Sequence, residues 1–209
     1  MQFNAHCSRY KLLPDYQSAY RENYSCETAL IKLTDDLLNA MEHQKVTALV
    51  ANDLSAAFNT VDHSILLSVL SKKLGVAGSA LKWFETYLYP RACKVNVGNS
   101  YSEVKDLNFS VSQGSCCGPF LYLAYASTIQ EVVPNDISLH GFADDHALKR
   151  CFQARNSHQE LTVMQSLENC LKDVNKWMGC NRLKMNNTKK ESVIFGTKGT
   201  VRKMQDNCN

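Results

Sequence analysis

The chain has 209 residues, which is long enough for one sizeable folded domain. Its hydrophobic share of 44% is ordinary for a globular protein, so the chain is neither fibrous nor of low complexity. Its net charge of +3 permits a nucleic-acid partner without indicating one. It has no 18-residue apolar run, no apolar signal region and no Cys-x-x-Cys pair among nine cysteines. We therefore expect an intracellular protein of the cytoplasm or nucleus, with reduced thiols and no membrane contact.

The first part of the chain predicts an irregular N-terminal segment, a helix, a buried strand and one further helix. An apolar stripe predicts a helix over residues 25–43, with Ser25 as its N-cap. Residues 46–51 are β-branched and apolar, which is typical of a strand buried on both faces. Asp53 follows that strand and indicates either a ligand site or a turn cap, because an unpaired buried carboxylate is costly. Asp62 is expected to cap the next helix.

The second half alternates hairpins and helices. In chain order we expect a helix over 78–89, a hairpin over 93–109, a small-residue loop over 110–119, a helix over 120–133, a second hairpin over 137–152, a long helix over 157–178, and short strands at 183–186 and 192–195. The polar residues 197–209 are expected to be frayed. This order favours an α+β domain, with helices packed on one face of a small, mainly antiparallel sheet.

Two adjacent carboxylates, Asp144 and Asp145, stand at the tip of the second hairpin. Neighbouring side chains on a straight strand point to opposite faces, so only a tight turn lets both reach one spot. A solvated turn is the plain alternative. If the strand before Asp53 neighbours this hairpin, three carboxylates meet at one sheet edge and repel one another unless cations neutralise them. Two Mg²⁺ ions roughly 4 Å apart are the usual solution in polymerases and nucleases.

Five segments resemble, in the family's order, the motifs of reverse transcriptases from non-LTR (LINE-type, jockey-like) retrotransposons. They are Gln17-Ser18-Ala19-Tyr20-Arg21 for the fingers segment, Asp53 to His63 for motif A, Gln113-Gly114-Ser115 with Gly118-Pro119 for motif B, Phe142-Ala143-Asp144-Asp145 for motif C, and Leu183 to Asn186 with Lys189 and Glu191 for motif D. Departures from the usual pattern are Asn59, Ser112, Phe142 and Lys190. None of them removes a metal ligand.

The resemblance implies a reverse-transcriptase palm with a partial fingers segment and a thumb that is absent or truncated. Residues 1–45 would form the partial fingers segment and leading helix, 46–196 the palm with motifs A to D, and 197–209 the frayed tail. A polymerase without a thumb is expected to hold primer–template weakly, since affinity comes from many phosphate contacts.

The resemblance also implies an RNA-directed DNA polymerase, which transfers a nucleotide from a dNTP to a primer 3′-OH. Asp53 and Asp144 would be the main ligands of two Mg²⁺ or Mn²⁺ ions, with Asp145 in support. The backbone carbonyl of Leu54 would complete one ion's shell. The implied partners are an RNA template, a DNA primer and dNTPs, and the oligomeric state is left open.

The implied nucleotide-binding residues are Arg21, Phe58, Gln113, Gly114 and Lys189. Arg21 would grip the triphosphate and Phe58 would exclude a 2′-OH by bulk. Gln113 and Gly114 would sit against the template base and nucleotide, and Lys189 would lie near the pyrophosphate. The residues alone leave three plainer roles open. Phe58 could be a core residue, Gln113 a loop-stabilising amide and Lys189 a solvated lysine.

Two rival functions accompany this interpretation. The chain could be a catalytically inactive fragment of a mobile element, at most a nucleic-acid-binding remnant. A metal-dependent nuclease or phosphatase would explain the three acids. That second rival leaves Phe58 and the Gln113-Gly114 pair, and their order in the chain, unexplained.

Overall fold

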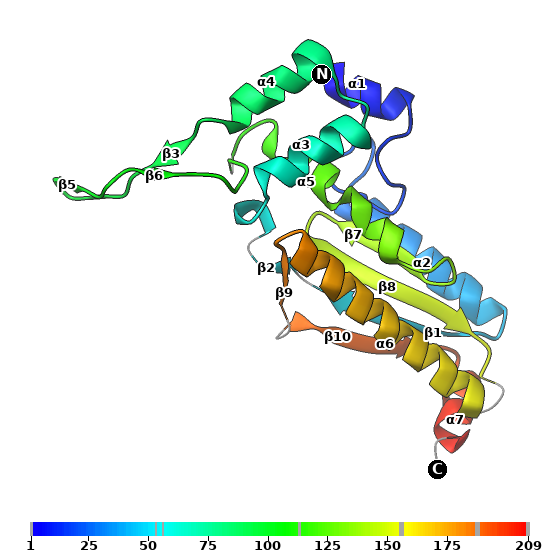
Figure 1. The fold of residues 1–209 in the computed structure, drawn as a ribbon. Helices are drawn as coiled ribbons and strands as arrows, with labels where there is room; N and C mark the ends of the chain where they lie inside the picture. The colour runs from blue at the N-terminus through cyan, green and yellow to red at the C-terminus, as the bar shows by residue number, and fades with distance from the viewer. Residues whose placement is uncertain are drawn as a thin grey trace. The chain divides into compact units, whose positions relative to one another are not determined.

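The structure is a computed structural model that describes residues 2–52, 54–55, 57–112, 114–154, 157–186 and 189–207 (Figure 1). The chain forms two compact units, each built from several stretches of sequence. Unit 1 comprises Met1–Leu13, Ala56–Ser127 and Asn181–Leu183, and unit 2 comprises Pro14–Ser55, Thr128–Cys180 and Lys184–Asn209. The predicted boundaries at residues 45 and 196 stay a prediction about functional segments.

A four-stranded antiparallel sheet with the strand order β10-β1-β8-β7 is the centre of unit 2. Its strands are β1 (Val46–Asn52), β7 (Ser138–Phe142), β8 (Asp145–Phe152) and β10 (Glu191–Phe195). The other elements are α2 (Cys26–Glu42), η2 (Ser127–Val132, which starts at the end of unit 1), α6 (Ser157–Cys180), α7 (Lys198–Asn207), and the short pair β2 (Leu54–Ser55) with β9 (Lys184–Met185). The prediction of an α+β fold with a small antiparallel sheet is thus confirmed.

Helix α6 supplies the main apolar stripe of unit 2. Buried residues recur along it at helical spacing: Val163, Leu167, Cys170, Leu171, Val174 and Met178. The alternate residues Val46, Ala48 and Val50 of β1 are buried as well. Because each fully buried aliphatic side chain contributes about 2 kcal/mol, this packing holds β1 and β8 in fixed positions.

The helices lie on both faces of this sheet, whereas the sequence predicted one face. Figure 1 shows α6 over one face and α2 over the opposite one. Lys149 of β8, although only 5% exposed, points toward α2 and lies 2.5 Å from the carboxylate of Asp36. A buried ammonium needs such a partner, so this ion pair binds α2 to the face opposite α6.

The polar C-terminal tail forms a helix, which corrects the expectation of a frayed segment. Thr197 caps α7, since its Oγ1 accepts a hydrogen bond from the backbone N–H of Thr200 at 3.3 Å. Threonine is a favourable N-cap residue. The side chain of Thr200 is itself only 6% exposed, so tertiary packing adds to the local cap.

Unit 1 is a helical cluster from which a β-hairpin extends. Its elements are α1 (Gln2–Arg9), η1 (Ala57–Asn59), α3 (His63–Lys72), α4 (Gly78–Leu88), β3 (Ala92–Cys93), β4 (Asn96–Val97), β5 (Ser100–Tyr101), β6 (Lys105–Asp106) and α5 (Gly118–Ala126). Asp62 caps α3 as predicted, accepting hydrogen bonds from the N–H groups of Ser64 and Ile65. The described cysteines are free thiols. Among the described helices, none has the length and apolar character that a bilayer crossing requires.

Candidate functional site

The end of β1 lies beside the turn between β7 and β8. Asn52, the last residue of β1, pairs with His146 of β8, and Phe142 pairs with Asp145 across the hairpin. The sequence-based condition that the two strands be neighbours in one sheet is therefore met. Asp53 itself lies outside the described residues, so its convergence with Asp144 stays a prediction.

The turn that carries the two acids has an unusual backbone. Ala143 has a φ of 55°, in the left-handed region, and is buried. A non-glycine residue pays about 1 kcal/mol or more for this conformation, so other contacts must stabilise it. The turn leaves Asp144 half-buried and Asp145 exposed. Both carboxylates are thus at the surface end of the sheet, where a ligand can reach them.

Asp144 is coupled to a buried histidine and a tyrosine. His146 Nδ1 lies 3.0 Å from the backbone carbonyl of Asp144, so this nitrogen carries the proton and donates. Burial lowers the pKa of His146, while the Asp144 carbonyl and carboxylate oppose that shift. The pKa of Tyr20 is raised, first by burial and then by the Asp144 carboxylate. His146 is therefore neutral at pH 7 and orients the turn as a hydrogen-bond donor.

Stability is expected to fall on acidification because of His146. The folded-state pKa of His146 lies below the unfolded value of about 6.5. Its contribution to the free energy of unfolding is therefore complete above that pH and is lost as the pH falls below it. The loss is at most about 1.4 kcal/mol per pH unit. Urea unfolding at about pH 7.5 and about pH 5.5 measures it. His146→Gln should reduce the pH dependence, whereas the exposed control His158→Gln should not; an equal dependence in both variants would contradict this assignment.

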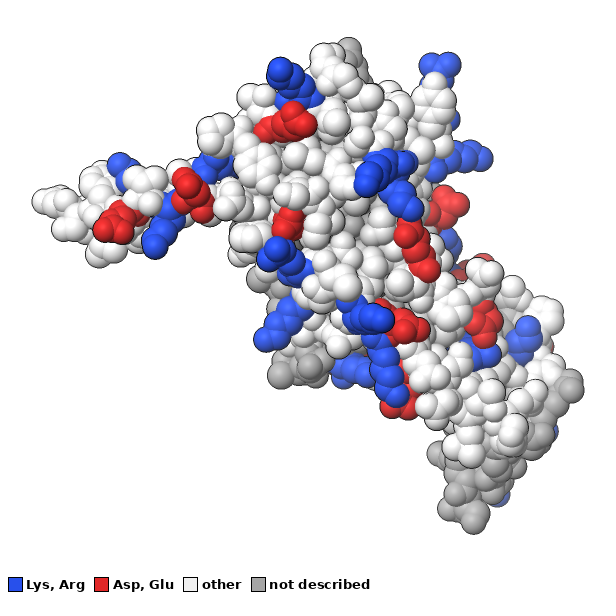
Figure 2. Space-filling model, viewed as in Figure 1, with Lys and Arg blue, Asp and Glu red and all other residues white. Residues whose placement is uncertain are grey.

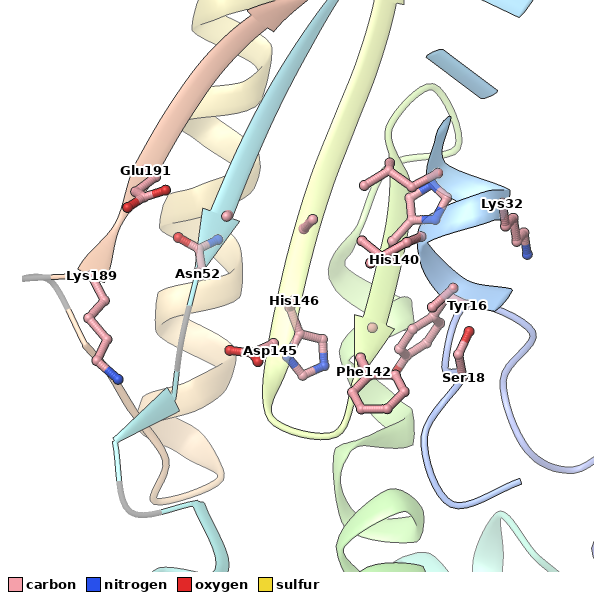
Figure 3. Close-up of a pocket in the computed structure, with 16 residues that line it drawn as sticks. Tyr16, Ser18, Lys32, Asn52, His140, Phe142, Asp145, His146, Lys189 and Glu191 are labelled. Carbon is pink, nitrogen blue, oxygen red and sulfur yellow. The ribbon is translucent and has the colours of Figure 1, made fainter. Parts of the chain in front are cut away.

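A cavity of about 450 Å³ opens at this edge of the sheet (Figure 3). The polar and aromatic side chains that line it are Tyr16, Ser18, Lys32, Asn52, His140, Phe142, Asp145, His146, Lys189 and Glu191. Figure 3 shows Asp145 and Lys189 on either side of the end of β1, with Glu191 above Lys189. Carboxylate and ammonium groups therefore line the same cavity, as a site for a charged ligand requires. Elsewhere on the face in Figure 2, both signs of charge are interspersed.

The oxygen donors at this edge suit a hard cation. Within the described ranges no group of three or more His, Cys, Asp or Glu residues is placed to hold a metal ion. The Oδ1 atom of Asn52 is buried and has no hydrogen-bond partner among the described atoms. The amide of Asn52, the carboxylates of Asp144 and Asp145 and the backbone carbonyl of Leu54 all offer oxygen atoms, the donor type that Mg²⁺ prefers. The donor chemistry therefore fits a divalent ion, for which Asp53 would supply a further carboxylate.

Phe58, in η1 of unit 1, packs against a buried tyrosine. Its ring stacks on Tyr122 of α5 with a centroid distance of 4.8 Å and an interplanar angle of 27°. The Phe58 carbonyl accepts a hydrogen bond from Val111 N–H at 3.0 Å. The ring is half-buried, so one part of it is core while the rest is accessible to a ligand. Its predicted role against a nucleotide sugar stays a prediction.

The small-residue loop before α5 is held by serine hydroxyls. Ser115 Oγ donates to the carbonyl of Ser112 at 2.8 Å and accepts from Gly118 N–H at 2.9 Å. Gly114 has a φ of 80° and is exposed, so its backbone adopts a conformation that favours glycine. Gln113 lies outside the described residues, and its predicted role is untested. The loop thus presents Gly114 at the surface of unit 1.

Arg21 is occupied with backbone groups near the N-terminus of unit 2. Its Nη1 atom donates to the carbonyls of Pro14 and Gln17, both at 3.0 Å, and its guanidinium lies 4.6 Å from the ring centroid of Tyr24. Arg21 is not among the described residues that line the 450 Å³ cavity, whereas Lys189 is. The structure therefore assigns Arg21 a bracing function, and its predicted grip on a triphosphate stays untested.

Sequence reasoning missed several residues of this site. Asn52, His146 and Tyr16 belong to none of the five family-like segments, and Gln17 is only one position of the fingers-like segment. The signals were weak: one polar residue at the end of an apolar strand, and one histidine in a hairpin. The strand register pairs Asn52 with His146, and the bridge between Gln17 and Gly141 brings the segment of Tyr16 to the same edge.

Comparison with known proteins identifies related sequences. The model of a family described as reverse transcriptase (RNA-dependent DNA polymerase) matches residues 2–205. The chain is 30% identical over 144 residues to a probable RNA-directed DNA polymerase from transposon BS of Drosophila melanogaster, covering 66% of this chain and 16% of that protein. It is 26% identical over 194 residues to the RNA-directed DNA polymerase from mobile element jockey of the same organism, covering 90% and 20%. The chain thus spans a fifth or less of these relatives.

Solved structures with a similar fold include telomerases. The telomerase of Candida albicans, in complex with a TWJ fragment of telomeric RNA, matches with a TM-score of 0.68 at 10% identity, over 94% of this chain and 34% of that one. An apo telomerase of Candida tropicalis, truncated from its C-terminal domain, matches with a TM-score of 0.61 at 14% identity, over 92% and 38%. At these identities the likeness shows a shared fold, which is the palm-like α+β arrangement.

Proposed function

Because the chain belongs to the reverse transcriptase (RNA-dependent DNA polymerase) family, we propose that it is the RNA-directed DNA polymerase domain of a retrotransposon. Its reaction would be nucleotidyl transfer from a dNTP to the 3′-OH of a DNA primer on an RNA template. Residues 46–196 would be the palm, and residues 1–45 would belong to the fingers. The two polymerases of mobile elements named above support this assignment.

The pairing of Asn52 with His146 is the observation that carries the proposal. This register sets the strand that precedes Asp53 directly beside the turn of Asp144 and Asp145. Carboxylates from neighbouring strand ends reach the same edge of a sheet.

Divalent ions would be held by Asp53, Asp144 and Asp145, with the carbonyl of Leu54 as a further ligand. When bound, Mg²⁺ or Mn²⁺ would activate the primer 3′-OH and neutralise charge on the triphosphate. Two ions are proposed, since an in-line displacement has an attacking and a leaving oxygen. The buried Asn52 amide and the His146 donor would keep this edge polar and the turn oriented.

The remaining residues would bind and orient the nucleotide. Phe58 would lie under the sugar and exclude a 2′-OH by bulk, while Gln113 and Gly114 would contact the template base and nucleotide. Lys189, in the cavity, would neutralise negative charge on the leaving pyrophosphate or donate a proton to it. Arg21 would reach the triphosphate only after giving up its bonds to Pro14 and Gln17. In this mechanism the protein mainly positions the substrates and neutralises the charge on the phosphate groups.

A primer-extension assay tests the proposed function. The purified chain is incubated with an RNA template, a DNA primer and dNTPs, in Mg²⁺ and separately in Mn²⁺. Extension is expected, and EDTA should abolish it. If the primer is not extended with either metal at high enzyme and template concentrations, the polymerase assignment of this chain is overturned, and template binding measured alongside would then favour the nucleic-acid-binding remnant.

A further inference from the structure

A short N-terminal segment of unit 2 runs alongside β7 at the site. Gln17 forms a parallel bridge with Gly141. The N–H of Ser18 donates to the Gly141 carbonyl at 2.9 Å, and the N–H of Gly141 donates to the Tyr16 carbonyl at 2.8 Å. The segment is thereby aligned with the last residues of β7, directly before the turn that carries Asp144.

The side chain of Gln17 contacts both peptide groups of Ala143. Its Oε1 atom accepts from Ala143 N–H at 2.9 Å, and its Nε2 atom donates to the Ala143 carbonyl at 3.1 Å. The same Oε1 atom accepts from Ala19 N–H at 3.0 Å. Gln17 is only 2% exposed, so these bonds are shielded from water. An amide can satisfy an N–H and a carbonyl at once because it holds an acceptor and a donor in one plane.

These bonds act at the strained residue of the turn. Ala143 has a φ of 55° and immediately precedes Asp144. Two buried hydrogen bonds contribute enough to offset the cost of a left-handed alanine. We propose that Gln17 is a positioning residue, whose amide holds the Ala143 peptide groups and thereby directs the Asp144 and Asp145 carboxylates to their ligand. This rests on the proposed function, in which those acids bind the divalent ions.

The two hydrogen bonds between the Gln17 amide and Ala143 form a clamp, and Arg21 and Gly141 support it. Arg21 donates to the Gln17 carbonyl at 3.0 Å and so fixes the backbone from which the amide projects. Gly141 allows the close approach, since a Cβ there would lie 3.0 Å from Gln17 Nε2 and 3.2 Å from Tyr16 Cδ2. Gln17 does not itself line the 450 Å³ cavity, so it acts through the turn rather than on a nucleotide.

Gln17→Met is the variant that tests the clamp, because methionine keeps the length of the side chain but loses both polar atoms. Gln130→Met is the matched control, since Gln130 is exposed in the same unit. Mn²⁺ binding by electron paramagnetic resonance and the rate of primer extension are measured for each. We expect Gln17→Met to weaken Mn²⁺ affinity and lower kcat by about 10- to 100-fold, as for other residues that orient ligands. The KM for dNTP should be unchanged.

Amide hydrogen exchange provides a readout independent of polymerase activity. Loss of the clamp should raise exchange at the Ala143 amide, whereas the amide of Leu148, inside β8, should keep its protection and show that the sheet is intact. Gln17→Glu is a second probe, because it keeps the acceptor but turns a carboxylate oxygen toward the Ala143 carbonyl. Its defect should be at least as large as that of Gln17→Met.

Gly141→Ala should strain the same contact, because a Cβ at Gly141 would lie only 3.0 Å from Gln17 Nε2. The added methyl group should displace the Gln17 amide and reproduce the loss of Mn²⁺ affinity. Gly179→Ala is its control, because a Cβ at Gly179 meets no atom within 4 Å. If Gly141→Ala binds Mn²⁺ as the unaltered chain does, the close approach of the segment has no role in the site.

The results separate this inference from the proposed function. If the unaltered chain extends primer, and Gln17→Met binds Mn²⁺ and extends primer equally well, the positioning role is overturned while the polymerase assignment stands. If the unaltered chain neither binds Mn²⁺ nor extends primer, the proposed function is overturned and the positioning role falls with it. Reduced Mn²⁺ affinity together with faster exchange at Ala143 supports both.

Discussion

Replacing Asp144 with Asn is expected to lower the rate of primer extension on an RNA template by about 10³-fold or more. The substitution keeps the size of the side chain and removes one negative charge from the sheet edge where β1 meets the hairpin turn. The remaining acids would then hold a divalent ion weakly, and charge on the triphosphate would be left without compensation. Single-turnover extension with Mg²⁺ measures the rate, and Mn²⁺ titration measures the affinity.

Asp35→Asn is the matched control for this prediction. Asp35 is an exposed carboxylate on α2 in the same unit, so its replacement changes the net charge equally without touching the turn. Its rate should equal that of the unaltered chain. An Asp144→Asn variant that extends primer at the normal rate would remove the metal-binding role from this turn, whatever its effect on stability.

Replacing Phe58 with Ala is expected to relax the choice of sugar. If the ring excludes a 2′-OH by bulk, its removal should raise incorporation of rNTPs relative to dNTPs by about 10²-fold, which is the discrimination that a steric pocket supplies. The rate with dNTPs should fall less than the rate with rNTPs rises. Competition between a dNTP and the matching rNTP in one extension reaction measures the ratio directly.

The same substitution also removes packing, and the two effects can be separated. Phe58 stacks on Tyr122, so Phe58→Ala should cost about 3 kcal/mol of unfolding free energy. Phe84→Ala removes a buried ring from the same unit and should lower stability without changing the rNTP-to-dNTP ratio. A ratio that stays constant in folded Phe58→Ala would leave Phe58 as a core residue only.

Local sequence signals predicted most elements because they depend on nearest neighbours along the chain. The Ser25 cap is observed, with its hydroxyl accepting from Thr28 N–H at 3.2 Å, and α2 begins at the next residue. Asp62 caps α3 in the same way. Capping and the helical repeat of apolar residues involve spacings of a few residues, which a single sequence displays directly.

Tertiary contacts account for the differences. The order of elements does not predict that α2 covers the second face of the sheet. The ion pair between Asp36 of α2 and Lys149 of β8, 113 residues apart in sequence, holds the helix there. Helix α7 was expected to be frayed because its residues are polar, yet a threonine cap and the burial of Thr200 stabilise it. Such pairings are set by packing between segments distant in sequence.

The sequence by itself determined the acids and their order. The chain carries Asp53, Asp144 and Asp145 together with Phe58, Gln113, Gly114 and Lys189 in the order of a known family's motifs. That order indicates the chemistry. The tertiary structure alone decided that β1 pairs with β8, and that Gln17 binds the Ala143 peptide groups 126 residues away. Hydrogen bonds between distant backbone segments have no signature in local composition, because the partner is chosen only when the sheet assembles.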